Sequence, residues 1–396
     1  MSWRRSIGLV LMALIILQVM SVHAKSGRAD ASALQFVQPN GIAAGVNYSL
    51  FLRNDGAVMS VGLGNYYELG TGNSSQSSLQ VIPNISNVVS VASGGTYASY
   101  ALMSDGTVKS WGYGNSNYAL GFPDSASRIT PTIIPGLLNV VQITAGSGFA
   151  AALLSDGTVK VWGKNSYGQL GLGMTSTVTS PTAIPGLTGV KQIAAGNSFM
   201  LALMNDGTVK SWGYNSSGQL GLGDSAMRLT PTAVSGLMNV MQIAAGAYHS
   251  LAVLNDGTVK TWGSNSFGEL GLGNTTTMYK PTVVPGLTSV SHITGGYYNS
   301  IATMSDGTVK SWGYNTYGQA GTGTTSTSYT PTLLASESNI KYAVTSMYNG
   351  FSFLVPSDYS VKAMGYNGNY QLGLSDSSNR LIPTLVSNLQ LIGVPL

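Results

Sequence analysis

The 396-residue chain contains no cysteine, only three histidines and few charged side chains. The absence of cysteine excludes disulfide bonds and lipid attachment to an N-terminal cysteine, so packing must stabilise the fold. Charged residues make up 8% of the chain, against about 25% in an average soluble protein. With 43% apolar residues, this low charge excludes a charge-driven disordered chain. Lysine and arginine do not cluster beyond Arg4-Arg5, which argues against a nucleic-acid partner.

The first 24 residues have the three parts of a secretory signal peptide. Arg4 and Arg5 supply positive charge, residues 7–20 are almost wholly apolar, and Val22-His23-Ala24 resembles the signal that precedes a cleavage site. A membrane anchor is the alternative, but this apolar run is short against the ~20 residues that span a bilayer. We therefore expect cleavage after Ala24 and a mature chain, residues 25–396, that is secreted or periplasmic and no longer attached to the membrane.

The rest of the chain is one motif that recurs about every 50 residues. Each copy contains an Asp followed by Gly, or by Tyr in the last copy, at Asp55, Asp105, Asp156, Asp206, Asp256, Asp306 and Asp358. Six residues later, five copies have Trp-Gly, with the tryptophans Trp111, Trp162, Trp212, Trp262 and Trp312. Val61-Gly62 and Met364-Gly365 fill this slot in the first and last copies. Seven copies at a fixed period are typical of repeat architectures such as propellers.

The copy around Asp256 shows the elements of one unit. Residues 242–245 and 250–254 are apolar runs, Asp256-Gly257 predicts a two-residue primed hairpin turn, and residues 258–262 return as a third strand. Residues 281–284 predict an edge strand, where the missing N–H of Pro281 is tolerated. Four strands in each of seven units predict an all-β fold, a seven-bladed β-propeller of four-stranded blades in a single domain. Residues 34–38 or 390–396 could add the strand that closes the ring, and the sequence leaves open which.

These repeated residues also carry a family resemblance. The pattern Ala-Ala-Gly, Ser-Leu-Ala, Asp-Gly-Thr-Val, Trp-Gly and Asn-x-x-Gly-Gln-Leu-Gly resembles the regulator of chromosome condensation repeat, over residues 41–389. The resemblance implies the propeller fold. It implies little about function, because the family includes a nucleotide exchange factor, a plant ultraviolet photoreceptor and a secreted β-lactamase inhibitor.

Three repeated residue types have structural interpretations. The aspartates are turn residues, because Asp before Gly favours a turn. The tryptophans are core residues, one in each of five units, rather than a light-sensing cluster. Lysines four residues after the aspartates are expected to lay their stems on apolar surface, with an anion-binding ring as the alternative, at Lys109, Lys160, Lys210, Lys260, Lys310 and Lys362.

The sequence offers little for enzyme chemistry. The mature chain has only His249 and His292 as neutral nitrogen ligands, which cannot build a metal site of three or four N or S ligands. We interpret His249 as structural. Outside the hairpins, seven acidic residues remain: Asp30, Glu68, Asp124, Asp224, Glu269, Glu337 and Asp376. Three of these share one slot in repeats that are not neighbours, whereas paired catalytic carboxylates lie within about 10 Å. We expect no catalytic residue, no cofactor and no metal.

Aromatic residues at variable positions predict a recognition face. One set lies seven or eight residues before each hairpin Asp, and the other follows Trp-Gly, so strand direction places both sets on the face opposite the hairpins. The candidate binding residues are Tyr48, Tyr66, Tyr67, Tyr97, Tyr113, Tyr118, Phe149, Tyr167, Phe199, Tyr214, Tyr248, Phe267, Tyr298, Tyr314, Tyr317, Phe351, Tyr366 and Tyr370, with Tyr297 beside one of them. Tyrosine is enriched at binding hot spots, although aromatics can also fill gaps between blades.

These observations predict a secreted, non-enzymatic binding propeller that docks a protein partner through the aromatic face. A glycan binder or a propeller enzyme that uses the same face is the alternative, because tyrosine rings also stack on sugars. Guanine-nucleotide exchange is less favoured, since the chain carries an export signal and has no long insertion between repeats. The partner, the oligomeric state, the source organism and the choice between periplasm and medium are left open by the sequence.

Overall fold

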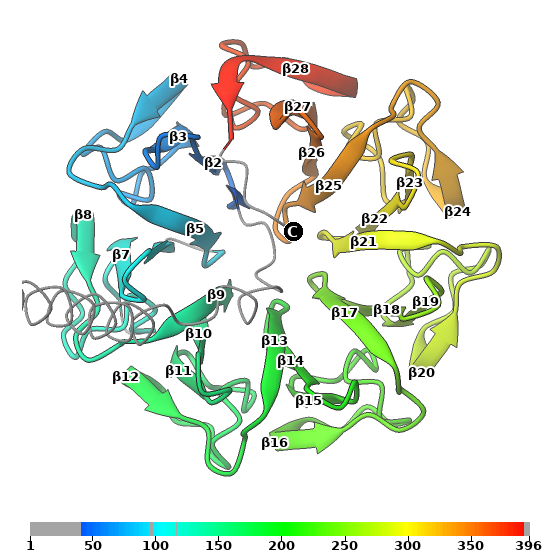
Figure 1. The fold of residues 1–396 in the computed structure, drawn as a ribbon, viewed down its shortest axis with the longest axis horizontal. Coiled ribbons are helices and arrows are strands. Elements are labelled where there is room, and N and C mark those ends of the chain that lie inside the picture. Colours follow the sequence, from blue (N-terminus) through cyan, green and yellow to red (C-terminus); the bar gives the residue numbers. More distant parts are fainter. Residues whose placement is uncertain (1–40, 96–97, 116, 392–396) are drawn as a thin grey trace, which may run out of the picture. The chain divides into compact units, whose positions relative to one another are not determined.

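The computed structural model describes residues 41–95, 98–115 and 117–391, which lie in one compact unit. This part of the chain forms 28 strands in seven four-stranded antiparallel sheets, arranged as blades around a common centre (Figure 1). The predicted all-β, seven-bladed propeller is confirmed. Within the described residues, no helix is long and apolar enough to cross a bilayer. The predicted signal peptide and residues 34–38 lie outside the described residues.

Each blade consists of four consecutive strands, ordered from the centre outward. The innermost strands are β1 (Ile42–Ala44), β5 (Val88–Ser93), β9 (Val140–Gly146), β13 (Val190–Ala195), β17 (Val240–Ala245), β21 (Val290–Gly295) and β25 (Ile340–Thr345). The second strands are β2 (Tyr48–Leu52), β6 (Ala98–Met103), β10 (Phe149–Leu154), β14 (Phe199–Met204), β18 (His249–Leu254), β22 (Asn299–Met304) and β26 (Phe351–Pro356). The third are β3 (Val58–Leu63), β7 (Val108–Gly112), β11 (Val159–Gly163), β15 (Val209–Gly213), β19 (Val259–Gly263), β23 (Val309–Gly313) and β27 (Ser360–Gly365). The outermost are β4 (Ser75–Val81), β8 (Arg128–Ile133), β12 (Val178–Ala183), β16 (Arg228–Ala233), β20 (Met278–Val283), β24 (Ser328–Leu333) and β28 (Arg380–Gln390).

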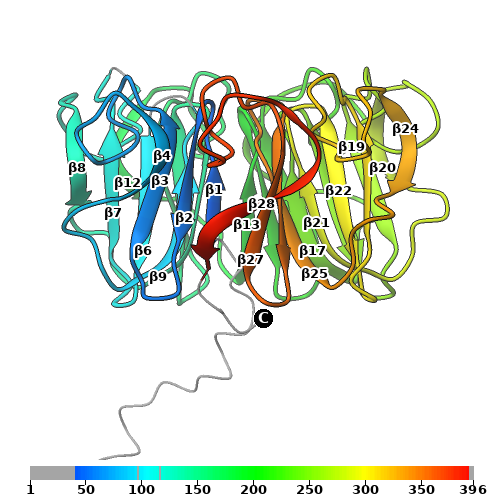
Figure 2. The same ribbon diagram turned by 90° about the horizontal axis from the view of Figure 1, so that it is seen from above.

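The strands run between two faces of the ring, which Figure 2 shows from the side. We call the face with the turns between second and third strands the hairpin face. The opposite face, which carries the loops between first and second and between third and fourth strands, is the loop face. In blade 5, β18 and β19 are almost wholly buried, whereas β20 is partly exposed and contains Pro281. The outermost strand is therefore the edge, as the proline predicted.

The hairpin turns differ from the predicted two-residue primed turn. Gly257 N donates to Leu254 O (2.9 Å) and Leu254 N donates to Thr258 O (2.9 Å), which encloses a three-residue loop. Only the glycine of this loop has positive φ, +76°, so the turn is a type I turn followed by a left-handed residue. Asp256 closes it, because its Oδ1 accepts from Thr258 N (2.9 Å) and Oγ1 (2.7 Å). The interpretation of the aspartates as turn residues is confirmed.

The tryptophans join neighbouring blades. All five side chains are fully buried, which confirms their core role. Trp212 Nε1, in blade 4, donates to Gln169 O of blade 3 (3.0 Å), and the other four tryptophans make the same bond to the preceding blade (2.8–2.9 Å). The indole lies against Gly171, where an added Cβ would come within 2.8 Å of Nε1. The last glycine of Gly-Gln-Leu-Gly therefore makes room for the next blade's tryptophan.

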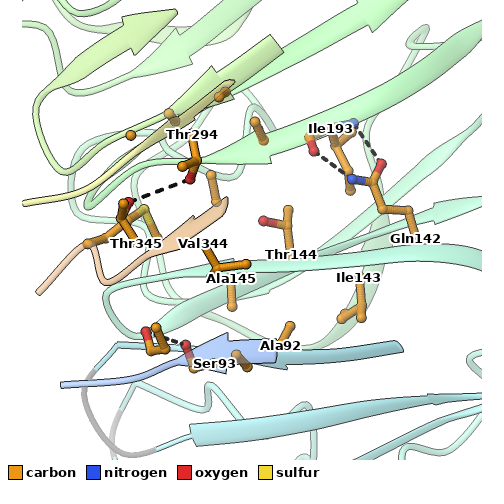
Figure 3. Close-up of a pocket in the computed structure, with 18 of the residues that line it drawn as sticks. Ala92, Ser93, Gln142, Ile143, Thr144, Ala145, Ile193, Thr294, Val344 and Thr345 are labelled. Atoms are coloured by element: carbon orange, nitrogen blue, oxygen red, sulfur yellow. Dashed lines mark hydrogen bonds between the residues drawn. The ribbon is translucent and has the colours of Figure 1, made fainter. Parts of the chain in front are cut away.

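Glutamine side chains connect the innermost strands of blades 3 to 6. Gln142 Nε2 donates to Ile193 O (2.9 Å) and Gln142 Oε1 accepts from Ile193 N (2.9 Å), as Figure 3 shows. The same pair of bonds, at 2.8–3.1 Å, joins Gln192 to Ile243 and Gln242 to Ile293. We call these three residues the glutamine ladder. Gln142 and Gln192 line a central cavity of about 170 Å³, to which all seven innermost strands contribute residues.

Within the part of the chain that the structure describes, the ring closes without exchange of a strand between blades. Blade 1 uses β1 and blade 7 ends with β28, so each sheet is built from its own segment of the chain. The C-terminal end makes one isolated bridge to blade 1, between Leu391 and Arg53. Ser346 Oγ of blade 7 donates to Gly45 O of blade 1 (2.7 Å), so side chains complete the contact between the two blades.

Candidate functional site

Seven aromatic side chains form a continuous series on the loop face of blades 5, 6 and 7. We call this series the aromatic arc; its members are Tyr248, Phe267, Tyr297, Tyr298, Tyr314, Tyr317 and Tyr366. Neighbouring rings have centroids 4.2–6.4 Å apart, and all pairs but Tyr297–Tyr298 fall in the usual range of about 4.5–7 Å. All seven are half-buried, so each ring is held by its neighbours and still reaches solvent.

The arc is built from a contact that recurs between neighbouring blades. An aromatic residue in the loop after the third strand of one blade packs on the residue that follows Trp-Gly, or Met-Gly, in the next blade. Phe267 and Tyr314 are 4.9 Å apart in this way, and Tyr317 and Tyr366 are 5.1 Å apart. Two further pairs, outside the arc, have the same relation: Tyr66 with Tyr113 (5.1 Å) and Tyr167 with Tyr214 (4.7 Å).

Three tyrosines on the inner loops extend the arc toward the centre. Tyr248 ends the loop between β17 and β18, and Tyr297 and Tyr298 end the loop between β21 and β22. Tyr298 packs on Phe267 (4.8 Å) and so connects the inner loops to the outer pair. Asn197 Nδ2 donates to Tyr248 Oη (2.8 Å), which orients that phenol. Burial raises the pKa of Tyr248 and Tyr298, so both remain neutral phenols that can donate a hydrogen bond.

Four predicted face residues lie in the core instead. Tyr48, Phe149, Phe199 and Phe351 are each at most 1% exposed, so they cannot belong to an exposed surface. Each begins a second strand and pairs with the glycine of Trp-Gly or its equivalent. The prediction treated aromatics seven and eight residues before the hairpin Asp as one set, although these spacings correspond to two different positions: the first residue of the second strand and the residue before it. Successive residues point to opposite sides, and only the residue before the strand, as at Tyr248, lies in the loop.

The remaining candidates are distributed around the loop face. Tyr66, Tyr67, Tyr113 and Tyr167 are 38–39% exposed. Tyr118 and Tyr370 are half-buried and, like Tyr67, have positive φ of 53–68°. These three occupy the slot of the first glycine in Gly-Gln-Leu-Gly, which has φ of +70° at Gly168. Tyr97 lies outside the described residues. The prediction that these side chains bind a partner remains a prediction.

Several acidic residues in the loops of the loop face already have partners. Glu269 is fully buried; its Oε1 accepts from Ser264 Oγ (2.6 Å) and its Oε2 accepts from Phe267 N (2.8 Å). Burial raises the pKa of Glu269. Three aspartates in the loops before β8, β16 and β28 pair with an arginine four residues later: Asp124, Asp224 and Asp376. In the described part of the chain, no three His, Asp or Glu side chains come close enough to hold a metal ion.

The two histidines are structural in different ways. His249 is fully buried, its Nε2 lies 3.0 Å from Ser300 Oγ, and burial lowers its pKa to about 3. The structural interpretation of His249 is confirmed. His292 occupies the slot of the glutamine ladder in blade 6, where burial lowers its pKa to about 4. Its ring packs edge-on against Tyr342 of blade 7 at 6.0 Å. The ladder ends here because the imidazole replaces the amide.

The lysines reach back toward the preceding blade. Lys260 Nζ donates to Gly236 O (3.0 Å), and Lys160 Nζ donates to Gly136 O (3.3 Å). Lys362 Nζ instead pairs with Glu337 Oε2 (2.8 Å). Their stems are half-buried in the strands, in agreement with the interpretation of stems on apolar surface. The alternative, an anion-binding ring, stays a prediction.

Sequence models of known families match most of the chain. The model described as RCC1-like domain matches residues 32–243. Two models of the regulator of chromosome condensation (RCC1) repeat match residues 240–269 and 290–319, and residues 256–303 and 306–350.

Curated relatives match only part of the chain. The human E3 ubiquitin-protein ligase HERC2 is 37% identical over 138 residues, 33% of this chain and 3% of the ligase. Protein pim1 of Schizosaccharomyces pombe is 38% identical over 101 residues, 22% of this chain and 18% of pim1. The Arabidopsis thaliana ultraviolet-B receptor UVR8 is 34% identical over 140 residues, 34% of this chain and 31% of the receptor. Each match spans less than a third of the relative's length.

Two solved structures share the fold over most of their length. Prp20p from Saccharomyces cerevisiae superposes with a TM-score of 0.76 and 24% identity, covering 91% of this chain and 90% of Prp20p. Human WBSCR16 superposes with a TM-score of 0.76 and 21% identity, covering 84% of this chain and 94% of that protein. At these identities the likeness concerns the fold alone.

Proposed function

We propose that this chain, which belongs to the RCC1-like domain family, is an exported, non-enzymatic binding propeller that docks a protein partner through the aromatic arc. The arc is the observation that carries this proposal. It offers rigid aromatic area with polar hydroxyl tips, the chemistry that is enriched at binding hot spots. It also crosses three neighbouring blades, so one partner surface can contact all of them together.

Engagement of the carboxylates in the loops of the loop face supports a role in binding rather than catalysis. A general acid or base must reach the proton that it transfers. Glu269 lies under the arc with no exposed surface, and both of its oxygens accept hydrogen bonds from the protein. The loop aspartates are held by arginines, as at Asp224 and Arg228 (2.6 Å). These groups are therefore occupied with holding loops in place.

The relatives supply precedent for a protein partner but not its identity. Prp20p of S. cerevisiae has been described with its binding properties to Gsp1p and histones. We expect a different, extracytoplasmic partner here, because residues 1–24 carry the pattern of a secretory signal peptide. A cytosolic location of the full-length chain would favour nucleotide exchange on a GTPase instead.

The proposal is tested by capture from the extracellular medium of the producing cell, with residues 25–396 as bait. Tyr314→Ala removes the ring that contacts both Phe267 and Tyr317, and it should weaken a captured protein by about 1–2 kcal/mol or more, roughly tenfold. Tyr329→Ala is the matched control, because Tyr329 is 46% exposed on the outermost strand β24. Equal loss with both variants, or with neither, contradicts docking through the arc.

A glycan ligand is the alternative for the same surface, because tyrosine rings also stack on sugars. A glycan array probed with the wild-type chain and with Tyr314→Ala separates the two ligand classes. Binding of a defined glycan that disappears in the variant, together with no protein captured from the medium, would favour the glycan.

A further inference from the structure

A second site lies on the loop face of blade 1, in a pocket distinct from the aromatic arc. The pocket has a volume of about 240 Å³, and the side chains of Asn47, Leu63, Asn65, Tyr66 and Glu68 line it. A water molecule occupies roughly 30 Å³ of liquid, so the pocket has room for a small side chain. Glu68 is its only charged lining residue, and that side chain is 94% buried, since 6% of the residue is exposed.

The carboxylate of Glu68 is only half satisfied by the protein. Its Oε2 accepts a hydrogen bond from Tyr66 N (2.8 Å). No other described residue donates a hydrogen bond to its Oε1, and this oxygen is not sealed in the core, because Glu68 lines the pocket. Burial raises the pKa of Glu68, although its own backbone N–H and that of Tyr66 favour the charged form. A cation that pairs with Oε1 would offset the cost of burying this charge.

Blade 5 shows how the same carboxylate is satisfied when it has only a structural role. Glu269 stands in the slot of Glu68, and its second oxygen accepts from Ser264 Oγ at 2.6 Å. The slot of Ser264 is occupied in blade 1 by Leu63, which has no donor. The missing donor lies at the wall of the pocket, because Leu63 and Glu68 both line it.

We propose that this pocket binds a primary ammonium group at the end of a flexible chain, as in a lysine side chain of a partner. Glu68 Oε1 would accept one N–H of the ammonium in a charge-assisted hydrogen bond. The ring of Tyr66, 39% exposed and 5.1 Å from Tyr113, would form an aromatic wall for the cation. A guanidinium fits less well, because its bidentate pairing needs both carboxylate oxygens and Tyr66 N already holds one.

The site does not rest on the proposed function. The pocket is in blade 1, the arc is in blades 5 to 7, and a small-molecule probe tests the pocket without any partner. A captured partner that needs the arc but not Glu68 would show that the pocket does not help to dock this partner. That result would leave the binding of an ammonium group to be tested by the small-molecule probe.

Titration of the mature chain with Nα-acetyl-lysine N-methylamide, followed by amide NMR shifts at Tyr66 and Glu68, tests the site. The ε-acetylated form of the same probe is the neutral comparison, and the arginine derivative tests the preference for ammonium. We expect saturable shifts with the lysine probe, none with its acetylated form, and weaker binding of the arginine probe. Absence of saturable shifts, equal binding of the acetylated form, or tighter binding of the arginine derivative would overturn the assignment.

Two matched variants assign the binding to one carboxylate. Glu68→Gln should weaken the lysine probe at least tenfold. It should fold normally, because glutamine fills this slot in four blades and accepts the same backbone N–H there, at Gln169, Gln219, Gln319 and Gln371. Glu269→Gln makes the same change at a carboxylate whose oxygens are both engaged, and it should alter the affinity less than twofold. Retained binding in Glu68→Gln, or equal loss in both variants, would contradict the site.

Discussion

Junctions between blades differ most between the middle of the repeat array and the place where the ring closes. From blade 1 to blade 6, each junction has a buried tryptophan that donates to a carbonyl of the preceding blade. Three of the central junctions add the glutamine ladder. These contacts are copies of one another because the repeats that supply them are copies.

The junction between blades 7 and 1, which we call the seam, uses other contacts. Val61 stands in the tryptophan slot of blade 1 and makes no hydrogen bond with its side chain. Phe51 and Phe353 pack edge-on instead, with centroids 5.3 Å apart. Asn349 Nδ2 donates to Val46 O and to Asn47 Oδ1, both at 3.1 Å.

The difference explains why the first and last repeats are the degenerate ones. A repeat in the middle of the array faces neighbours that resemble itself, so one set of contacts serves every junction. The first and last repeats must fit each other as well as their neighbours. Their departures from the motif, at Val61, Met364 and Asp358-Tyr359, thus concentrate in blades 1 and 7.

The largest effect should come from emptying a tryptophan slot. Trp212→Ala removes a fully buried ring and its bond to Gln169 O, and it should lower the free energy of unfolding by about 3–5 kcal/mol. Chemical denaturation measures this loss. Val61→Ala, in the same slot at the seam, deletes much less volume. Its loss of unfolding free energy should be smaller than that of Trp212→Ala by about 1–2 kcal/mol. Equal losses would mean that the two kinds of junction do not differ in this slot.

Breaking the glutamine ladder should have the next largest effect. Gln192→Leu leaves Ile243 N and Ile243 O buried without their partner, which should cost about 1–3 kcal/mol for each orphaned group. Ser90 occupies the same slot in blade 2, outside the ladder, and Ser90→Ala should change stability by less than about 0.5 kcal/mol. Denaturation of both variants under the same conditions compares the junctions directly. A loss at Ser90 as large as that at Gln192 would show that the ladder is not what holds these strands.

At the seam, Asn349→Ala should cost about 1–2 kcal/mol, because it removes hydrogen bonds to Val46 O and Asn47 Oδ1. We expect hydrogen exchange to increase first in β1 and β25, the innermost strands on the two sides of the seam. An increase spread evenly over all seven blades would instead mean that the seam is no weaker than the other junctions.

The hairpin aspartates should give the smallest difference, in their response to acid. The hydrogen bond from Arg53 lowers the pKa of Asp55 to about 2, and bonds from Thr258 lower the pKa of Asp256. A depressed folded-state pKa contributes stability above the unfolded value of about 3.9, and this contribution is lost as pH falls through the folded value. Carboxyl NMR titration should therefore show Asp55 losing its charge between about pH 4 and pH 2. Arg53→Ala should move the pKa of Asp55 up toward its ordinary value, and an unchanged titration of Asp55 in that variant would contradict a role of the ion pair.

Much of the fold was predictable because each prediction rested on local chemistry that is repeated seven times. The period gave the number of blades, the buried tryptophans followed from their fixed strand slot, and Pro281 marked the edge strand. The turn type was wrong because Asp-Gly fits both a primed turn and a type I turn with a left-handed glycine. The sequence does not separate these, since both place glycine at positive φ.

The candidate site was less predictable, because a face was inferred from spacing alone. One residue of offset moved Tyr48, Phe149, Phe199 and Phe351 from the loop face into the core. The spacing between packed residues could have found the cross-blade pairs: Tyr66 and Tyr113, Tyr167 and Tyr214, and Phe267 and Tyr314 are each 47 residues apart. Their contact is invisible in any single repeat.

By itself, the sequence determined the architecture: seven units of four strands, the positions of their turns, their core and their outer edge, because these depend on neighbours within one repeat. Only the tertiary structure decided which side chains join neighbouring blades. It brought Phe267 against Tyr314 and Tyr317 against Tyr366, and it formed the pocket beside Glu68. Contacts between repeats depend on the small rotation from each blade to the next. That rotation is set by packing of whole blades, and no local pattern in the chain encodes it.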